Sequence, residues 1–179
     1  MPDLAHAAAS PDLTLGTPEF RAVLRLKSWL PAYVTGGQPV VLAGRELPAQ
    51  VGGVLAAHPR VLCVGPGEWL LVAESLDSAA LRQEVKADLD SQGLVLVDVS
   101  QSLAVIRLAG AAARAVLAAG CGLDLHPRSF APERCARTRF AAVAAVLQCC
   151  AGESNFELYV ARSHAAYVRT WLADAAAGL

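Results

Sequence analysis

The segment from Gly120 to Phe130, GCGLDLHPRSF, places a thiol, a carboxylate, an imidazole and a guanidinium within a few residues. Cys121 and His126 are residue types that bind zinc, but no second pair of ligands follows at the spacing of a tetrahedral site. A catalytic thiol needs a neighbouring base, and nothing in the sequence argues for one. We therefore predict a helix end, with Gly120 in the left-handed conformation and Pro127 preventing the helix from continuing.

The segment from Gly120 to Phe130, which we call the elbow, carries side chains for which the simplest role is local packing. Leu123 and Leu125 are expected to point inward, and Cys121 to pack as a small apolar residue. Asp124 and Arg128 are expected to pair or to cap the turn. We predict no metal site on this chain.

Two further motifs admit both a structural and a chemical interpretation. Asp98 and Ser100 follow a strand, where their side chains most simply cap a turn, although Asp98 is also a carboxylate able to hold a substrate amine or a pterin. Gly65 to Trp69, GPGEW, lacks the third glycine of a dinucleotide-binding loop and lies between two strands. It therefore predicts a tight hairpin turn rather than a phosphate cradle.

Aromatic residues near the C-terminus follow the helical period. Tyr167 and Trp171 most simply belong to the apolar face of the last helix that packs on the core. The alternative is that they form a docking surface for another chain. We assign no catalytic or cofactor-binding residue. The residues that we single out as interface or structural-motif candidates are Trp69, Asp98, Ser100, Asp124, His126, Arg128, Arg162 and Trp171.

These motifs must be positioned by alternating strands and short helices. Strand–turn–strand patterns occur three times, at residues 60–73, 94–108 and 141–161, and each predicts a hairpin followed by a helix. Asp77 or Ser78 caps the first helix, the second spans about 111–119, and Ser163 caps the third. A further strand is expected at residues 20–26.

The order of these elements predicts an α+β fold, with antiparallel sheets covered by helices on one face and ferredoxin-like subdomains as the preferred version. Residues 1–17 show no periodicity and are expected to form a flexible arm. Residues 18–179 then form a single α+β domain, which can divide into two subdomains at about 18–93 and 94–179.

Composition excludes several function classes. Hydrophobic residues make up 55% and charged residues 17% of the 179 residues, which is ample for a buried core. The formal net charge of -1 and the absence of a basic run argue against nucleic-acid binding. No apolar run predicts a membrane span, and no secretory signal is evident. The five cysteines form no CxxC pair, which favours reduced thiols in the cytoplasm.

Taken together, the motifs between Leu62 and Ala175 resemble the gamma subunit of heterotetrameric sarcosine oxidase. The ordered series is more specific than any one motif. The family pattern has a GP-x-EWLL turn, a D-x-S hairpin, a GC-x-LDL-x-P elbow, an RT before a strand and an RS at the last helix. These match Gly65 to Leu71, Asp98 to Ser100, Gly120 to Pro127, Arg137 to Thr138 and Arg162 to Ser163.

The chain departs from this pattern at four positions. Gln101 and Ser102 stand where the family has His-Arg, Glu133 stands where glycine is common, and Ala161 replaces a tryptophan. The implied substrate is therefore sarcosine or another N-methyl amino acid.

The resemblance implies a fold like the folate-binding domain of aminomethyltransferases. It also implies a cytoplasmic oxidase complex with alpha, beta and delta subunits. FAD, FMN, NAD and tetrahydrofolate would serve the complex, with no cofactor on this chain. The chain would be a non-catalytic subunit that supports assembly of the flavin-bearing subunits. A stand-alone folate-binding or one-carbon-transfer protein is the alternative, and an unrelated α+β interaction module remains only if the resemblance is chance.

Overall fold

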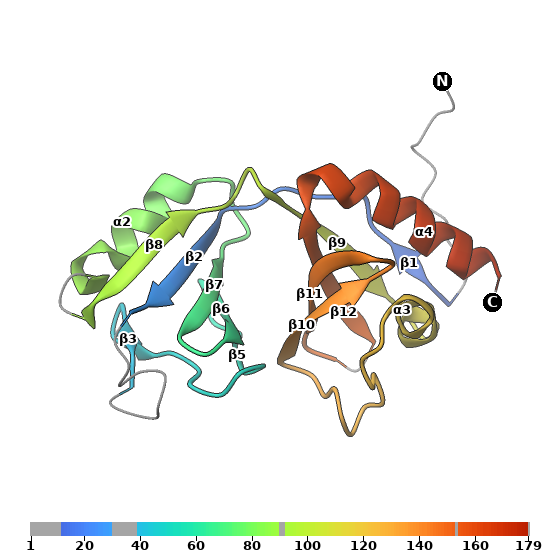
Figure 1. The fold of residues 1–179 in the computed structure, drawn as a ribbon, viewed down its shortest axis with the longest axis horizontal. Coiled ribbons are helices and arrows are strands. Elements are labelled where there is room, and N and C mark those ends of the chain that lie inside the picture. Colours follow the sequence, from blue (N-terminus) through green and yellow to red (C-terminus); the bar gives the residue numbers. More distant parts are fainter. Residues whose placement is uncertain (1–11, 30–38, 90–91, 153, 179) are drawn as a thin grey trace. The chain divides into compact units, whose positions relative to one another are not determined.

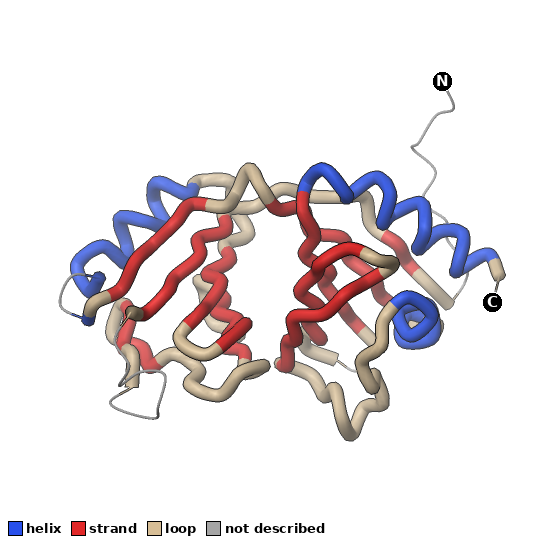
Figure 2. Tube along the Cα trace, viewed as in Figure 1, coloured by secondary structure: helices blue, strands red, loops and turns tan. Residues whose placement is uncertain are grey.

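The chain folds into two compact units, each with its own antiparallel sheet. The computed structural model describes residues 12–29, 39–89, 92–152 and 154–178. Unit 1 comprises the described parts of Met1–Glu19, Ala104–Pro132 and Thr138–Leu179, and unit 2 those of Phe20–Leu103 and Glu133–Arg137. Figure 1 labels the helices and strands, and Figure 2 separates them by type. The predicted α+β class with antiparallel sheets is confirmed.

Unit 2 is built on a five-stranded sheet in the order β5-β6-β7-β2-β8, with every neighbouring pair antiparallel. A two-stranded sheet, β3-β4, and the helix α2 complete it. The elements are β2 (Val23–Ser28), β3 (Val41–Leu42), β4 (Arg45–Glu46), β5 (Val54–Leu55), β6 (Arg60–Gly65), β7 (Glu68–Val72), α2 (Ser78–Leu89) and β8 (Leu94–Asp98).

The predicted GPG turn joins β6 to β7 and is confirmed. Cys63 pairs with Trp69 across the hairpin, and Gly67 has a φ of +63°, a conformation that glycine adopts without strain. The predicted cap of the following helix is also confirmed, because Asp77 Oδ1 accepts a hydrogen bond from Ala80 N–H at 2.9 Å.

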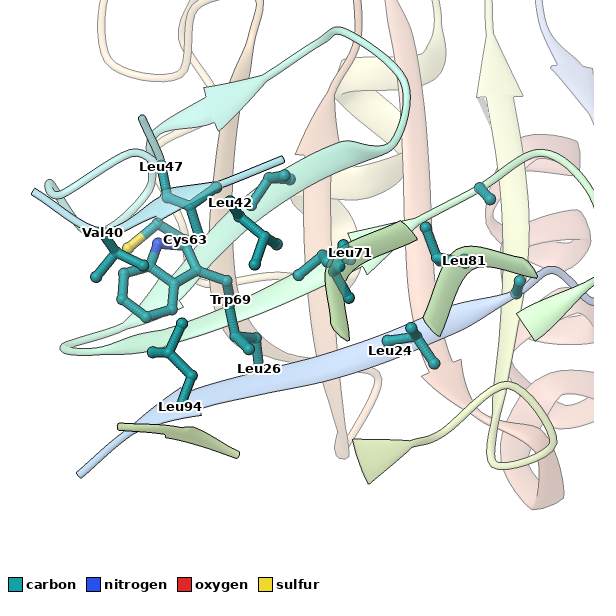
Figure 3. Close-up of a cluster of buried hydrophobic side chains, with 14 residues drawn as sticks. Leu24, Leu26, Val40, Leu42, Leu47, Cys63, Trp69, Leu71, Leu81 and Leu94 are labelled. Atoms are coloured by element: carbon teal, nitrogen blue, oxygen red, sulfur yellow. The ribbon is translucent and has the colours of Figure 1, made fainter. Parts of the chain in front are cut away.

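Trp69 lies in the middle of the core of unit 2 (Figure 3). Its side chain is 2% exposed, and its indole Nε1 donates a hydrogen bond to Pro48 O at 2.8 Å. Leu81 and Val85 bring one face of α2 onto the same core. Trp69 is therefore a structural residue of this motif and offers no surface to a partner.

Unit 1 holds the second five-stranded sheet, in the order β1-β9-β12-β11-β10. Its helices α3 and α4 pack against each other, and a 3-10 turn, η2, precedes α4. The elements are β1 (Thr14–Leu15), β9 (Leu103–Ala109), α3 (Ala113–Gly120), β10 (Arg134–Phe140), β11 (Val143–Cys149), β12 (Asn155–Ala161), η2 (Arg162–His164) and α4 (Ala165–Ala177).

Two strands extend across the division between the units. The first residue of β9, Leu103, and residues 134–137 of β10 belong to unit 2. The predicted N-terminal arm falls mainly on residues 1–11, outside the described part of the chain, whereas Thr14 and Leu15 pair with β9. The hairpin of β11 and β12 is confirmed, with Leu147 opposite Leu158.

The predicted hairpin over residues 94–108 is wrong in its pairing, although both strands exist. β8 pairs with β2 in unit 2, whereas β9 lies between β1 and β12 in the sheet of unit 1. Alternation of apolar residues predicts a strand but carries no information on its partner. Ser100 and Ser102 therefore lie in a connection between two sheets rather than in a hairpin turn.

Two predicted helix termini are also wrong. Gly120 is the last residue of α3 and has no positive φ, so the left-handed cap is absent. Ser163 lies within η2, and the N-cap of α4 is His164, without a side-chain cap bond. No helix in the described ranges is long and apolar enough to span a membrane.

Candidate functional site

The turn motif and the RT motif meet through Glu68 and Arg137 in unit 2. Arg137 Nη2 lies 2.8 Å from Glu68 Oε1 and Nη1 lies 3.4 Å from Oε2, a two-point contact that fits a guanidinium to a carboxylate. Arg25 Nε is 3.5 Å from the same carboxylate. The hydrogen bond from Arg137 is the main cause that lowers the pKa of Glu68. The pair joins the middle of β10 to the start of β7.

The second residue of the RT motif meets the elbow in unit 1. Thr138 Oγ1 lies 3.4 Å from Cys121 Sγ, and Cys121 forms a β-bridge with Phe140. Cys121 is buried, as predicted. Phe140 also contacts Trp171 of α4 edge to face, with 5.0 Å between the ring centroids. The elbow, β10 and α4 therefore pack around one another.

The rest of the elbow is a surface turn that hydrogen-bonds within itself. Asp124 Oδ1 accepts from His126 N–H at 3.0 Å, and His126 Nδ1 accepts from Arg128 N–H at 3.2 Å. A hydrogen bond from Ser129 is the main cause that lowers the pKa of Asp124. Asp124 therefore caps the turn as predicted, and among the described contacts it makes no ion pair with Arg128. Leu125 is buried as predicted.

Asp98 and Ser100 form a capped turn at the end of β8. Asp98 Oδ1 accepts from Ser100 N–H at 2.9 Å and lies 2.6 Å from Ser100 Oγ. Ser100 Oγ in turn accepts from Val23 N–H at 2.9 Å. The hydrogen bond from Ser100 is the main cause that lowers the pKa of Asp98. The structural interpretation of this motif is confirmed, because these bonds join β8 to β2.

The remaining candidates lie around α4. Trp171 is half-buried against Phe140, while Tyr167 is 49% exposed and donates a hydrogen bond from its hydroxyl to Ala141 O at 2.9 Å. Arg162 is exposed in η2. The core stripe of α4 consists of Ala165, Val168 and Leu172.

The buried thiols of unit 2 are poor nucleophiles. Burial raises the pKa of the Cys63 thiol, and burial raises that of Cys135 to about 12. Since the thiolate is the reactive form, both sulfurs are protonated and inert near neutral pH. The described residues contain no group of three or more His, Cys, Asp or Glu able to hold a metal ion.

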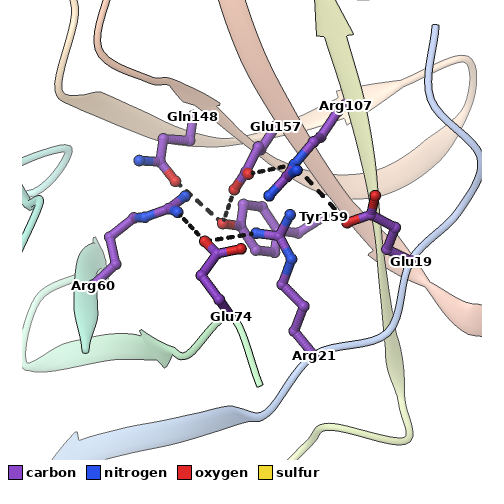
Figure 4. Close-up of polar contacts among 8 residues, drawn as sticks. All are labelled: Glu19, Arg21, Arg60, Glu74, Arg107, Gln148, Glu157 and Tyr159. Carbon is purple, nitrogen blue, oxygen red and sulfur yellow. Dashed lines mark hydrogen bonds and ion pairs between the residues drawn. The ribbon is translucent and has the colours of Figure 1, made fainter. Parts of the chain in front are cut away.

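Unit 1 contains a buried polar network that the sequence analysis missed. Glu157 is 4% exposed, and its carboxylate lies 3.2 Å from Arg107 Nε and 2.7 Å from the Tyr159 hydroxyl. The same hydroxyl is 3.1 Å from Gln148 Oε1 (Figure 4). A charged residue inside the apolar run FELYVA was the available signal, because a buried carboxylate needs partners.

A cavity of about 290 Å³ adjoins this network. Its lining includes Arg107, Ala109, Cys150, Asn155, Phe156 and Glu157. Each oxygen of the Glu157 carboxylate has a partner within the unit, Arg107 for Oε1 and the Tyr159 hydroxyl for Oε2. We interpret these contacts as stabilising the sheet of unit 1, and we do not assign Glu157 as a catalytic base.

Unit 2 also contains a group of paired charged side chains, drawn in Figure 4. Glu74 Oε1 lies 2.6 Å from Arg60 Nη2 and 3.4 Å from Arg21 Nη1. Arg21 is 2% exposed, so Glu74 compensates a buried guanidinium. None of the contacts described above places a nucleophile beside a free base.

A second cavity, of about 420 Å³, lies between α2 and β8 in unit 2. Its lining combines apolar side chains with two cationic ones. The residues around it include Arg82, Gln83, Lys86, Leu89, Leu94 and Leu96. Such a site suits an apolar group that also carries a negative charge.

Comparison with known proteins finds relatives that belong to a single family. A family model described as "Sarcosine oxidase, gamma subunit family" matches residues 31–178. A sarcosine oxidase subunit gamma from Corynebacterium sp. (strain U-96) is 31% identical over 175 residues, which is 97% of this chain and 83% of the relative. One from an Arthrobacter species is 34% identical over 134 residues, 74% of this chain and 64% of the relative.

Solved structures agree with these sequences. A chain of the heterotetrameric sarcosine oxidase from Corynebacterium sp. U-96, in complex with pyrrole 2-carboxylate, matches with a TM-score of 0.76 and 30% identity. The match covers 97% of this chain and 86% of that one. Aminomethyltransferase T of the Bartonella henselae glycine cleavage system matches with a TM-score of 0.66 at 14% identity, over 90% of this chain and 45% of that one, and so shares the fold. The chain belongs to the sarcosine oxidase gamma subunit family.

Proposed function

We propose that this chain is the gamma subunit of a heterotetrameric sarcosine oxidase-type complex. The observation that carries this proposal is the extent of the structural match, which covers 97% of this chain and 86% of the Corynebacterium chain at 30% identity. A likeness over nearly the whole of both chains supports a shared role better than any single motif. The complex oxidatively demethylates sarcosine or a related N-methyl amino acid.

In this proposal the chain supports assembly and carries no catalytic residue. Its carboxylates in the motif regions are engaged locally, Glu68 with Arg137 and Asp98 with Ser100. The raised pKa of the Cys63 and Cys135 thiols also argues against a nucleophilic role.

The other components of the complex follow from the same proposal. Alpha, beta and delta subunits are the partners, and FAD, FMN, NAD and tetrahydrofolate are held outside this chain. A cytoplasmic location fits the five cysteines, which form no disulfide in the described part of the chain.

The alternative, a stand-alone folate-binding or one-carbon-transfer protein, has weaker support. The match to the aminomethyltransferase is at 14% identity and spans 45% of that chain, so it supports the fold alone. The gamma-subunit relatives match in sequence as well as in fold.

Co-expression tests the proposal. The chain is produced with the candidate alpha, beta and delta subunits of the same organism, and the complex is isolated through a tag on the beta subunit. We expect this chain to co-purify in equal proportion, with a flavin absorption spectrum and sarcosine-dependent peroxide formation.

A matched preparation without this chain provides the control. We expect it to give a much lower yield of assembled flavoprotein. Equal yield and equal turnover in its absence would contradict the assembly role. Titration of the isolated chain with tetrahydrofolate tests the alternative, which predicts heat of binding where our proposal predicts none.

A further inference from the structure

In the part of the chain that the structure describes, β8 is an edge strand without a lysine, a proline or a bulge of its own. It pairs with β2 on one side and ends the sheet on the other (Figure 1). Its sequence is LVLVD, and Val95 and Val97 are 44% and 50% exposed. Edge strands are normally blunted by lysine, proline or a bulge, because an open apolar edge recruits another strand. β8 has none of these, and its register against β2 is regular.

Among the described strands, β8 pairs with β2 alone, so one row of its backbone hydrogen-bonding groups is left open to a further strand. Val99 N–H donates to Val23 O, and Gly93 O accepts from Trp29 N–H, so the odd-numbered residues of this stretch face β2. In an antiparallel ladder alternate residues point the opposite way. Leu94, Leu96 and Asp98 therefore direct their backbone N–H and C=O groups away from β2, toward the edge.

The side of β8 that faces α2 offers a recess lined by apolar and cationic side chains. The apolar residues that line the 420 Å³ cavity are Leu89, Leu94, Val95 and Leu96. Arg82 and Lys86, one turn apart on α2, also line it. A strand added at this edge would direct every second side chain toward this recess.

The opposite side of β8 repeats the combination. In register, Val95 lies beside Lys27 and Val97 beside Arg25. The Lys27 ammonium lies 4.8 Å from the centroid of the Trp29 ring, which is 66% exposed. Exposed tryptophan and arginine are the residues that most often anchor protein interfaces.

We propose that an extended segment of a partner subunit pairs with the open edge of β8, and that this segment is apolar with flanking Asp or Glu residues. The inference rests on the proposed function, since the partner is taken to be another subunit of the oxidase complex. The charges around β8 favour an acidic segment as the one that pairs with its edge. The cations around the strand are Arg25, Lys27, Arg82 and Lys86, against the carboxylates of Glu68 and Asp98.

A second copy of this chain is a poorer occupant of the same edge. Two β8 strands paired with each other would bring Arg82 and Lys86 of one copy toward the same cations of the other. Like charges at an interface disfavour association, whereas Asp or Glu of a partner would neutralise them. Addition of a strand also satisfies the open backbone groups, which a helix or loop cannot do as regularly.

The double variant Val95→Glu/Val97→Glu tests the side-chain part of the inference. Both side chains are exposed, so the isolated chain should fold normally, which thermal unfolding verifies. Affinity for the purified alpha–beta–delta assembly is expected to fall by about tenfold or more, because glutamates then oppose an acidic segment. Val51→Glu is the matched control, since Val51 is 46% exposed in a turn of the same unit, and it should bind like the wild type.

Hydrogen exchange tests the backbone part and does not depend on any variant. The amides of Leu96 and Asp98 should exchange rapidly in the isolated chain and become protected in the assembled complex. Amides of the central β6–β7 hairpin should be protected in both states and provide the internal reference.

The outcomes separate this inference from the proposed function. If the wild-type chain does not join the complex, the proposed function fails and this inference fails with it. If it joins and the double variant binds equally well, or if exchange at Leu96 and Asp98 is unchanged, only the edge-pairing inference is overturned. If sedimentation shows a dimer of the isolated chain that the double variant abolishes while complex assembly persists, a second copy occupies the edge and the partner assignment is wrong.

Discussion

At the scale of single residues, the family motifs act by fitting elements together. Gly120 ends α3 where two aromatic rings approach its backbone. A Cβ built on this residue would lie 2.7 Å from Trp171 Cη2 and 2.8 Å from Phe140 Cζ. The elbow thus needs glycine for space and not for a left-handed conformation.

We expect Gly120→Ala to destabilise the protein by roughly 1–3 kcal/mol, because the added methyl group overpacks the contact with the two rings. Alanine has the higher helix propensity, by about 1 kcal/mol, so steric repulsion must exceed that gain. Urea unfolding measures the difference. Gly122→Ala is the control, since a methyl group on Gly122 would meet nothing within 4 Å, and it should change stability by less than about 0.5 kcal/mol. Equal stability of the two variants would refute the role of Gly120.

Glu68 predicts a specific dependence of stability on pH. The hydrogen bond from Arg137 lowers the pKa of Glu68 in the folded protein. The stabilisation of the folded protein by the Glu68–Arg137 pair is therefore fully present above the pKa of Glu68 in the unfolded chain, about 4.3. It is lost as the pH falls through the lower pKa of Glu68 in the folded protein. Because Arg137 is 48% exposed, we expect only about 0.5–1 kcal/mol.

Glu68→Gln measures this contribution. Its unfolding free energy should lie below that of the wild type at pH 7, and the difference should shrink as the pH falls below about 4. In an Arg137→Ala background the substitution should have a smaller effect at pH 7. A difference that does not change between pH 7 and pH 3 would show that the ion pair contributes no stability.

At the scale of elements, β8 and β9 show how neighbouring strands reach different sheets. Only four residues, Val99 to Ser102, separate them, yet β8 is bonded to β2 and β9 to β1 and β12. Ser100 ends β8 firmly, because its hydroxyl contacts both Val23 N and Val23 O, at 2.9 and 3.3 Å. The chain can then leave the sheet of unit 2 without fraying its edge strand.

Ser100→Ala should therefore cost about 1–2 kcal/mol, since Ser100 is buried and the change leaves Val23 N–H without its partner. Thermal unfolding measures the loss, and hydrogen exchange should show faster opening at β8 than at the β6–β7 hairpin. Ser102→Ala, at an exposed position in the same connection, is the control and should have little effect. Equal melting temperatures for the two variants would contradict the anchoring role.

At the scale of the whole molecule, the chain consists of two α+β units, and each contains buried or half-buried charged side chains that pair with one another. Glu157 with Arg107, and Glu74 with Arg21 and Arg60, are examples. In unit 2 we propose that the edge strand β8 pairs with a segment of a partner subunit. The co-expression and hydrogen-exchange experiments above test this pairing in the assembled complex.

Much of the local structure was determined by the sequence alone. Alternation of apolar residues located the strands β6, β7, β11 and β12, and the cap at Asp77 located the start of α2. These features depend on neighbours a few residues away, so local propensity suffices to predict them. The motif series also carried the family resemblance, which the comparisons confirm.

Only the tertiary structure decided which segments meet. It separated β8 from β9, placed aromatic rings against Gly120, and joined Glu68 to Arg137 across 69 positions of sequence. It also revealed the buried partners of Glu157. Such contacts depend on how distant surfaces pack, a property that no short window of sequence contains, because strand and helix patterns specify which face is buried but not what buries it.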